Sequence, residues 1–403
     1  METPGRKHPF FGVLSTQNIH IEITGKCNLQ CKYCYNATYN SSAFIKNELS
    51  SDQICRIIEQ AKKIGIHNFS ISGGEPFLKP GLEKIIEACT GCALTIFTSA
   101  MYISEKWLNY FYDHPQVKTL KISLDGLESN DRIRIGSKHL VVLENVRKLA
   151  HNDGINLEIN TMMTSQNIAD FLPLYHTLKS IPINRWNFDI PTFTSRMREK
   201  ENLNLYNINF KELIEQLSKL IFLHLKEDCK FRLSIRYLYD SSIGGSDELI
   251  QAIKEYGDDL LFPPSVHPCL FERVLVIRPD GAITRCSSHN EILNKITDDS
   301  DIVNVFTESE NNDFMNIKVQ DLTNCQNCRY LGICGGGCRA NAKYFCGTNF
   351  DSNPIACSIL PLAEKSLWNR LPTDKSAYYY ELINSNGNYP VPSDNLLDCL
   401  KTQ

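Results

Sequence analysis

The chain has 403 residues, and its 42 basic and 46 acidic residues give a net charge of −4, which provides no reason to expect a nucleic-acid partner. The sequence contains no run of 18 or more apolar residues, which argues against a membrane partner or a membrane-spanning helix. The first 18 residues lack the apolar core of a signal peptide, so we expect a cytoplasmic protein.

Short β-branched runs alternate with helical patterns over the first half of the chain. Strands are predicted at residues 19–23, 67–71, 94–98, 117–124, 155–162 and 185–190. Helices are predicted between them, from residue 51 onward and at 81–89, 104–112, 140–150 and 171–178. This alternation indicates a parallel sheet with right-handed crossovers. Since a full eight-stranded barrel needs about 250 residues, we expect an α/β fold with a partial (β/α)6 barrel.

The alternation stops after Pro191. Residues 192–209 are polar, and residues 210–226 form a strongly amphipathic helical pattern. From Cys269 onward the predicted elements are short and cysteines are frequent. We therefore divide the chain into a lead-in (1–18), a partial barrel (19–205), a helical connector (206–268), a small cysteine-rich domain (269–358) and a C-terminal extension along the surface (359–403).

Sixteen cysteines are unusual in a chain without an export signal, because structural disulfides rarely persist in the cytosol. Metal binding or redox chemistry is the usual explanation. Cys27, Cys31 and Cys34 follow the first predicted strand, at the barrel edge where active sites gather. Three thiolates can bind three irons of a [4Fe–4S] cluster and leave the fourth iron open. The alternative is a zinc loop with a distant fourth ligand.

A second motif, Ser72-Gly-Gly-Glu-Pro76, follows the second predicted strand. Its two glycines allow the backbone to approach a ligand closely, and Glu75 offers an acceptor for a cationic group. Alone, the motif is equally typical of a simple strand-to-helix turn. Its position at the same barrel edge as the cysteine loop favours a shared site.

These motifs resemble radical S-adenosylmethionine (SAM) enzymes. The cysteine loop, with Tyr33 before its third cysteine, is similar to the CxxxCxxC signature of that family. Residues 73–76 are similar to the family motif that binds the methionine amine of SAM. The resemblance implies that the cofactor-binding residues are Gly73, Gly74, Glu75, Pro76, Tyr33, Ser123, Arg134 and Asn160. Arg132 is a rival to Arg134, and the alternative for these polar residues is turn capping or surface charge. The resemblance indicates no catalytic acid or base.

The second group of cysteines comprises Cys269, Cys286, Cys325, Cys328, Cys334, Cys338, Cys346 and Cys357. Their spacing alone suits two zinc sites as well as two iron–sulfur clusters. The pattern Cx11Gx4C followed by Cx2Cx5Cx3C resembles the SPASM domain of radical SAM enzymes, which carries two auxiliary [4Fe–4S] clusters. The resemblance implies that the first auxiliary cluster is bound by Cys269, Cys286 and Cys338, and the second by Cys325, Cys328, Cys334 and Cys357. Either Cys346 completes the first cluster or one of its irons stays open.

The resemblance implies an enzyme that cleaves SAM reductively to a 5′-deoxyadenosyl radical and abstracts hydrogen from a substrate. SPASM enzymes mostly crosslink or oxidise ribosomally made peptides or proteins. Ser287 and Ser288 after Cys286 argue against the sulfatase-maturing branch. Only about 18 residues precede the first strand, so we expect a separate leader-recognition protein or direct binding, and an external electron donor such as flavodoxin or ferredoxin. The alternatives are a small-molecule substrate, such as a tetrapyrrole side chain, and a non-catalytic iron–sulfur electron carrier.

Overall fold

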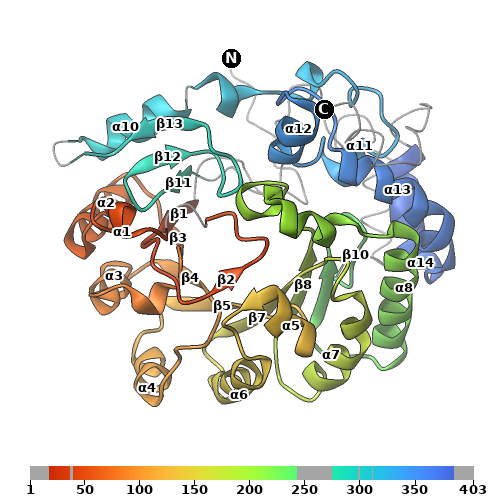
Figure 1. The fold of residues 1–403 in the computed structure, drawn as a ribbon, viewed down its shortest axis with the longest axis horizontal. Helices are drawn as coiled ribbons and strands as arrows, with labels where there is room; N and C mark the ends of the chain where they lie inside the picture. The colour runs from red at the N-terminus through yellow and green to blue at the C-terminus, as the bar shows by residue number, and fades with distance from the viewer. Residues whose placement is uncertain (1–17, 37–39, 243–274, 298–299, 311, 385–403) are drawn as a thin grey trace.

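The computed structural model describes residues 18–36, 40–242, 275–297, 300–310 and 312–384 (Figure 1). Within these residues one sheet has the strand order β10-β9-β8-β7-β5-β4-β3-β1-β11-β12-β13. The six strands expected from the sequence form its centre and pair in parallel. They are β1 (Asn18–Glu22), β3 (Asn68–Ser72), β4 (Ala93–Thr98), β5 (Val117–Ser123), β7 (Asn156–Met162) and β8 (Arg185–Asp189).

The sheet continues beyond these six strands at both edges. On one edge β9 (Arg232–Ile235) pairs in parallel with β8, and β10 (Tyr239–Asp240) pairs antiparallel with β9. On the other edge β11 (Leu275–Ile277) pairs in parallel with β1. The antiparallel strands β12 (Ala282–Thr284) and β13 (Ile292–Lys295) follow it. Strands from the predicted connector and from the predicted cysteine-rich domain therefore share one sheet with the barrel; the domain bounds themselves stay a prediction.

Helices connect the parallel strands, as the sequence pattern predicts. They are α1 (Ser42–Ile45), α2 (Ser51–Lys63), α3 (Leu82–Ala88), α4 (Glu105–Asp113), α5 (Glu128–Ile133), α6 (His139–Leu149), α7 (Phe171–Leu178) and α8 (Phe210–Lys226). Helix α2 illustrates why they form: Ser50 and Gln53 make a capping box at its start. Its buried residues recur at helical spacing and face the sheet: Ile54, Ile57, Ile58 and Ala61.

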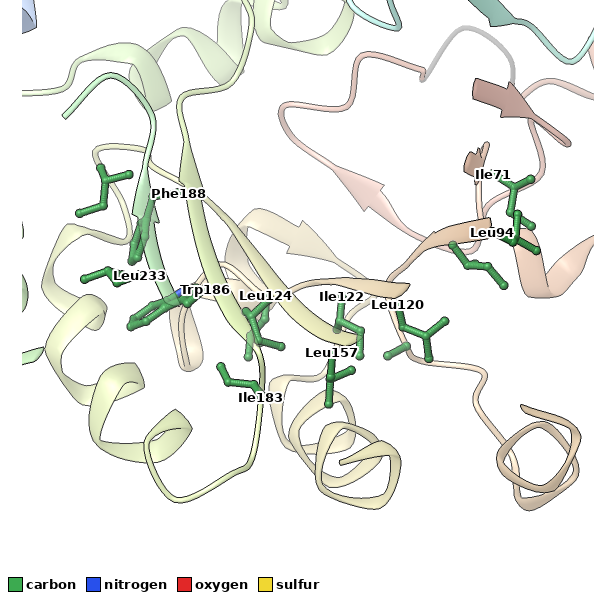
Figure 2. Packing of buried hydrophobic residues seen from close by; sticks show 14 of the residues in the cluster. Ile71, Leu94, Leu120, Ile122, Leu124, Leu157, Ile183, Trp186, Phe188 and Leu233 are labelled. Atoms are coloured by element: carbon green, nitrogen blue, oxygen red, sulfur yellow. The ribbon is translucent and has the colours of Figure 1, made fainter. Parts of the chain in front are cut away.

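The core lies between the sheet and these helices. Figure 2 shows side chains from neighbouring strands in one buried cluster, among them Leu120 and Ile122 of β5, Leu157 of β7 and Trp186 of β8. Parallel strands are covered by helices and therefore carry many apolar residues. This packing fixes the carboxyl ends of the strands, from which the candidate site is built.

The C-terminal part is helical and partly buried. It comprises α10 (Ile302–Glu310), α11 (Leu331–Cys334), α12 (Arg339–Cys346), α13 (Pro354–Ser366) and α14 (Thr373–Asn384). Helix α13 packs beside α8, on the β9 side of the sheet (Figure 1). Trp368 is fully buried, so residues 359–384 are an integral part of the fold rather than the surface extension that we expected. No helix in the described part of the chain is long and apolar enough to cross a membrane.

Candidate active site

The loop with Cys27, Cys31 and Cys34 leaves the carboxyl end of β1 and is held from two sides. The short strand β2 (Gln30–Cys31) pairs with β6 (Arg134–Ile135), which puts Cys31 opposite Arg134 in register. On the other side, Arg196 donates from its side chain to the carbonyl oxygen of Cys31 and from its backbone to that of Cys34, both at 3.4 Å. Residues distant in the sequence therefore fix the loop.

The three thiols are close enough to influence one another electrostatically. Burial, together with the charge of ionised Cys31, raises the pKa of Cys27 to about 11. Burial likewise raises the pKa of Cys34 to about 12, with ionised Cys31 as the next cause. Burial also raises the pKa of Cys31, whereas the charge of Arg134 opposes that rise. Bound iron would supply positive charge that stabilises the thiolates, so metal binding would release protons.

The residues present fit a three-thiolate cluster with a polar ligand beside it. No three His, Cys, Asp or Glu side chains within the described ranges are grouped so as to hold a single metal ion. A four-iron cluster does not need such a group, because each thiolate binds a different iron. Next to the loop, Nε of Arg134 and both side-chain polar atoms of Asn36 are buried without a hydrogen-bond partner among the described residues. Such buried polar atoms are normally satisfied, which indicates a ligand here.

Gly73 and Gly74 bring the turn after β3 against the start of the cysteine loop. A Cβ atom at Gly73 would overlap the carbonyl oxygen of Thr24, and one at Gly74 would overlap that of Lys26. The backbone N–H of Gly74 donates to the Thr24 oxygen at 2.5 Å. The sequence predicted a close approach to a ligand, whereas these glycines approach the protein's own backbone and so align the two loops.

Glu75 is fully buried and is bound by residues at the end of β4. Its Oε1 accepts from the Thr98 hydroxyl at 2.7 Å, and its Oε2 accepts from the Ser99 backbone N–H at 2.9 Å and hydroxyl at 2.5 Å. Burial raises the pKa of Glu75, and the Ser99 hydrogen bonds oppose that rise. The following residue, Pro76, is buried at the start of a 3-10 helix. A role for Glu75 toward the cofactor amine stays a prediction.

Tyr33, Asp125 and Arg134 form a buried cluster beside the cysteine loop. The Tyr33 hydroxyl donates to Oδ2 of Asp125 and accepts from Nη1 of Arg134 at 2.5 Å. Oδ1 of Asp125 accepts from the backbone N–H of Met162 at 2.8 Å. Arg134 is therefore oriented by two side chains. The sequence reasoning missed Asp125, although a carboxylate directly after a predicted barrel strand was an available signal.

Ser123 is the last residue of β5, and Asn160 lies near the carboxyl end of the adjacent strand β7. They are register partners in the β5–β7 pair, and both are half-buried. Nδ2 of Asn187 donates to Oδ1 of Asn160 at 2.9 Å. By contrast, Arg132 is exposed and pairs with Glu128 at 3.9 Å. The structure therefore brings Arg134, and not its rival Arg132, to the cysteine loop.

The structure also brings together Cys325, Cys328, Cys334 and Cys357. Burial raises the pKa of Cys334 well above its usual value, and the other three thiolates raise it further. Burial raises the pKa of Cys325 to about 11 and that of Cys357 to about 12. These are the four residues that the family resemblance assigns to one cluster.

Arg339, which the sequence reasoning also missed, lies next to this group of four cysteines. Its charge lowers the pKa of Cys325 and Cys357. Its buried guanidinium donates to the carbonyl oxygens of Asn349 at 2.9 Å and Asp351 at 2.5 Å. Arg339 therefore joins the two loops around the cysteines and supplies a positive charge near their sulfurs.

The remaining predicted ligands have other contacts, and one of them lies outside the described residues. Cys269 is outside them. Cys338 lines a cavity of about 20 Å³ at the ends of β8 and β9, together with Asp189 and Arg236. The Cys346 thiol donates to the carbonyl oxygen of Ser352 at 3.9 Å. The assignment of Cys269, Cys286, Cys338 and Cys346 to one cluster stays a prediction.

Sequence comparisons relate the first half of the chain to known proteins. Residues 21–178 match the model of the Radical SAM superfamily. An S-adenosylmethionine-dependent nucleotide dehydratase of Thermoplasmatales archaeon (strain ISO4-H5) is 25% identical over 189 residues, which is 43% of this chain and 66% of that protein. A GTP 3′,8-cyclase of Clostridium perfringens (strain SM101 / Type A) is 27% identical over 176 residues, 41% of this chain and 53% of that protein. The chain thus spans only about half to two thirds of these relatives.

Structural comparisons extend over most of the chain. Streptococcus suis SuiB bound to precursor peptide SuiA has a TM-score of 0.63 at 18% identity, covering 86% of this chain and 77% of SuiB. Native anSMEcpe with bound AdoMet and Cp18Cys peptide has a TM-score of 0.64 at 18% identity, covering 92% of this chain and 99% of anSMEcpe. The predicted fold class, a parallel α/β sheet followed by a cysteine-rich region, is confirmed.

Proposed function

Residues 21–178 belong to the radical SAM superfamily, and from this premise we propose that the enzyme crosslinks or oxidises a ribosomally made peptide or protein. When bound, a [4Fe–4S] cluster together with SAM supplies a 5′-deoxyadenosyl radical that takes a hydrogen atom from the substrate. The chain itself binds and orients these groups, holds the substrate hydrogen near them and excludes water.

Residues at the carboxyl ends of β1, β5 and β7 would bind the cluster and the cofactor. Cys27, Cys31 and Cys34 would hold the SAM-binding cluster. Arg134, oriented by Tyr33 and Asp125, would direct its buried Nε and its charge at the cofactor. Ser123 and Asn160, which are register partners, would donate to or accept from the cofactor hydroxyls.

The C-terminal cysteines would hold two auxiliary clusters. We assign Cys325, Cys328, Cys334 and Cys357 to one of them, and the electrostatic effect of the other three thiolates on Cys334 supports this four-thiolate set. For the other cluster we propose Cys269, Cys286 and Cys338, with Cys346 as its fourth ligand. These clusters would accept an electron from the substrate or receive one from flavodoxin or ferredoxin.

The observation that carries the peptide proposal is the extent of the fold likeness. It covers 92% of this chain and 99% of anSMEcpe, whose structure holds a peptide. SuiB, with a comparable likeness, is bound to its precursor peptide. A separate leader-recognition protein remains part of the proposal.

The second candidate is a small-molecule substrate, and the sequence relatives favour a nucleotide within this class. The nucleotide dehydratase and the GTP 3′,8-cyclase match 41–43% of the chain. Matches of that length leave more than half of the chain outside the comparison, whereas the structural likeness includes it. The peptide proposal therefore explains more of the molecule.

Co-expression with short peptides encoded next to the gene, followed by mass spectrometry, tests the substrate class. We expect one peptide to lose the mass of two hydrogen atoms with the wild-type enzyme and to stay unchanged with Cys27→Ala/Cys31→Ala/Cys34→Ala. Consumption of GTP or another nucleotide by the purified enzyme, with every peptide unchanged, would favour the second candidate.

A further inference from the structure

A buried ion pair joins β1, which leads into the first cysteine loop, to the segment that follows its neighbouring strand β11. Glu22 is the last residue of β1 and Arg278 directly follows β11, the parallel neighbour of β1. Nη1 of Arg278 donates to Oε1 of Glu22 at 2.9 Å and to Oε2 at 3.0 Å. Both side chains are almost fully inaccessible, at 1% and 0% exposure. Neither has a role in the proposed chemistry.

The other nitrogen of the Arg278 guanidinium holds the loop of Cys286. Nη2 donates to the carbonyl oxygens of Cys286 at 3.4 Å, Ser287 at 2.8 Å and His289 at 3.2 Å. A guanidinium suits this arrangement because its donors diverge in one plane at fixed angles. The same side chain therefore contacts β1 through Nη1 and the backbone of residues 286–289 through Nη2.

Glu22 extends the connection to the first cysteine loop. The side chains of Tyr35 and Ser287 lie close enough to Glu22 to lower the pKa of its carboxyl, against the rise that burial causes. Tyr35 directly follows Cys34, and Ser287 directly follows Cys286. One carboxylate thus lies near the neighbours of two cysteines that are 252 positions apart.

Taking both charges of a pair out of water costs several kcal/mol per ion, so a buried pair is a poor source of stability. Its value lies in geometry, because removing one partner leaves the other buried and unpaired. Resting on the proposed function, we propose that Glu22 and Arg278 are positioning residues that fix the Cys286 loop, and with it the first auxiliary cluster, relative to the SAM-binding cluster.

This proposal also explains why a serine suits position 287. Its neutral side chain lowers the pKa of the Glu22 carboxyl, whereas an aspartate would bring a second carboxylate to a fully buried one. Two carboxylates at one buried site repel each other unless a proton is shared. Ser287→Asp is therefore a second, independent way to disturb the connection without removing either charge.

The test compares Arg278→Lys with Arg232→Lys as the matched control. Arg232 of β9 also binds a carboxylate through two nitrogens, to Asp240 at 2.7 and 2.6 Å, but at the opposite edge of the sheet. The proteins are reconstituted anaerobically with iron and sulfide. Iron content and the electron paramagnetic resonance (EPR) spectra with and without SAM are then recorded.

We expect Arg278→Lys and Ser287→Asp to lose roughly a third of the iron, one cluster of three, while the signal that responds to SAM is retained. Arg232→Lys should keep the wild-type iron content. If Arg278→Lys does not fold, Glu22→Gln, which preserves shape, carries the same expectation. If these variants keep the wild-type iron content and the wild-type EPR signals of the auxiliary clusters, the positioning role is wrong, whereas the proposed function is unaffected. A wild-type protein that forms no cluster responsive to SAM would overturn the proposed function and this role with it.

Discussion

At the scale of single residues, Arg134 shows how the fold prepares a charged group for a ligand. It lies opposite Cys31 across the β2–β6 pair and is held by the Tyr33 hydroxyl. Asp125, 3.7 Å from the guanidinium, balances its charge. Nη1 contacts both Tyr33 and Asp125, and the buried Nε has no partner among the described residues, so Nε is available to a polar group of a ligand.

We predict that Arg134→Gln weakens SAM binding by about 10- to 100-fold, the effect of losing a hydrogen bond to a charged group worth about 1.5–3 kcal/mol. The concentration of SAM that gives half-maximal 5′-deoxyadenosine formation measures this. Arg132→Gln is the matched control, because Arg132 is exposed and contacts only Glu128 among the ion pairs of the described residues. Equal SAM dependence in both variants would show that Arg134 does not meet the cofactor.

His20 is a buried neutral imidazole that makes stability depend on pH. Its ring nitrogens bond the hydroxyls of Ser70 at 2.8 Å and Ser72 at 2.6 Å. Burial, together with the charge of Arg278, lowers the pKa of His20 to about 3. Since the unfolded chain takes up the proton near pH 6.5, the stabilising contribution is complete above that pH. It falls as the pH drops toward 3.

Between about pH 7 and about pH 5.5, we predict that the wild-type protein loses roughly 1.4 kcal/mol more free energy of unfolding than His20→Gln. Anaerobic urea unfolding at the two pH values measures this difference. Parallel losses in both proteins would mean that His20 takes up its proton equally well when folded.

At the scale of elements, the helices after the cysteine-rich region stabilise the sheet edge formed by β9 and β10. The indole N–H of Trp368 donates to the carbonyl oxygen of Leu238 at 2.8 Å, between those two strands. The Trp368 ring stacks on Tyr379 of α14, with centroids 4.8 Å apart and planes inclined by 4°. Because β9 and β10 are only four and two residues long, they form few inter-strand hydrogen bonds and depend on this packing for stability.

We predict that Trp368→Ala lowers the free energy of unfolding by about 3–5 kcal/mol, the cost of a large cavity in a core. The exposed Leu140→Ala, on the outer side of α6, should change it by less than about 0.5 kcal/mol. Denaturant unfolding monitored by circular dichroism gives both values. A similar, small effect of both changes would show that α14 does not stabilise this edge.

The sequence predicted the alternating strands and helices well, because the helices repeat apolar residues with a period of 3.6 and the strands are rich in β-branched residues. The amphipathic pattern at 210–226 matches α8 at both ends. The strands β9 to β13 were missed because they are two to four residues long, too short for a period to appear. Helices α13 and α14 were missed for a different reason: Pro361 lies inside one, and the tyrosine run of the other has no clear apolar face.

At the scale of the whole molecule, the cysteines were predictable because ligand spacing is visible in sequence. Their surroundings were not predictable, because Arg339, Asp125 and the pair Glu22–Arg278 act through contacts between distant segments. Of these, Glu22 and Arg278 are 256 positions apart. Spacing identifies candidate ligands, whereas the charges that tune them come from tertiary structure.

Iron content tests the assignment of three clusters. We predict roughly 11–12 irons per wild-type chain after anaerobic reconstitution, and fewer in Cys325→Ala, whose cluster loses one thiolate. Cys55→Ala is the control, because its thiol donates to the Lys84 carbonyl oxygen at 3.5 Å and is not among the predicted ligands. Zinc as the only bound metal, or about four irons in the wild-type chain, would contradict the auxiliary clusters.

The central claim is that Cys27, Cys31 and Cys34 hold a cluster at which SAM is cleaved. The most direct measurement is the release of 5′-deoxyadenosine from SAM by the anaerobically reconstituted protein under dithionite, followed by chromatography and mass spectrometry. We predict release by the wild-type chain and none by Cys27→Ala/Cys31→Ala/Cys34→Ala. No release by an iron-loaded wild-type protein, or equal release by the triple variant, would contradict the account.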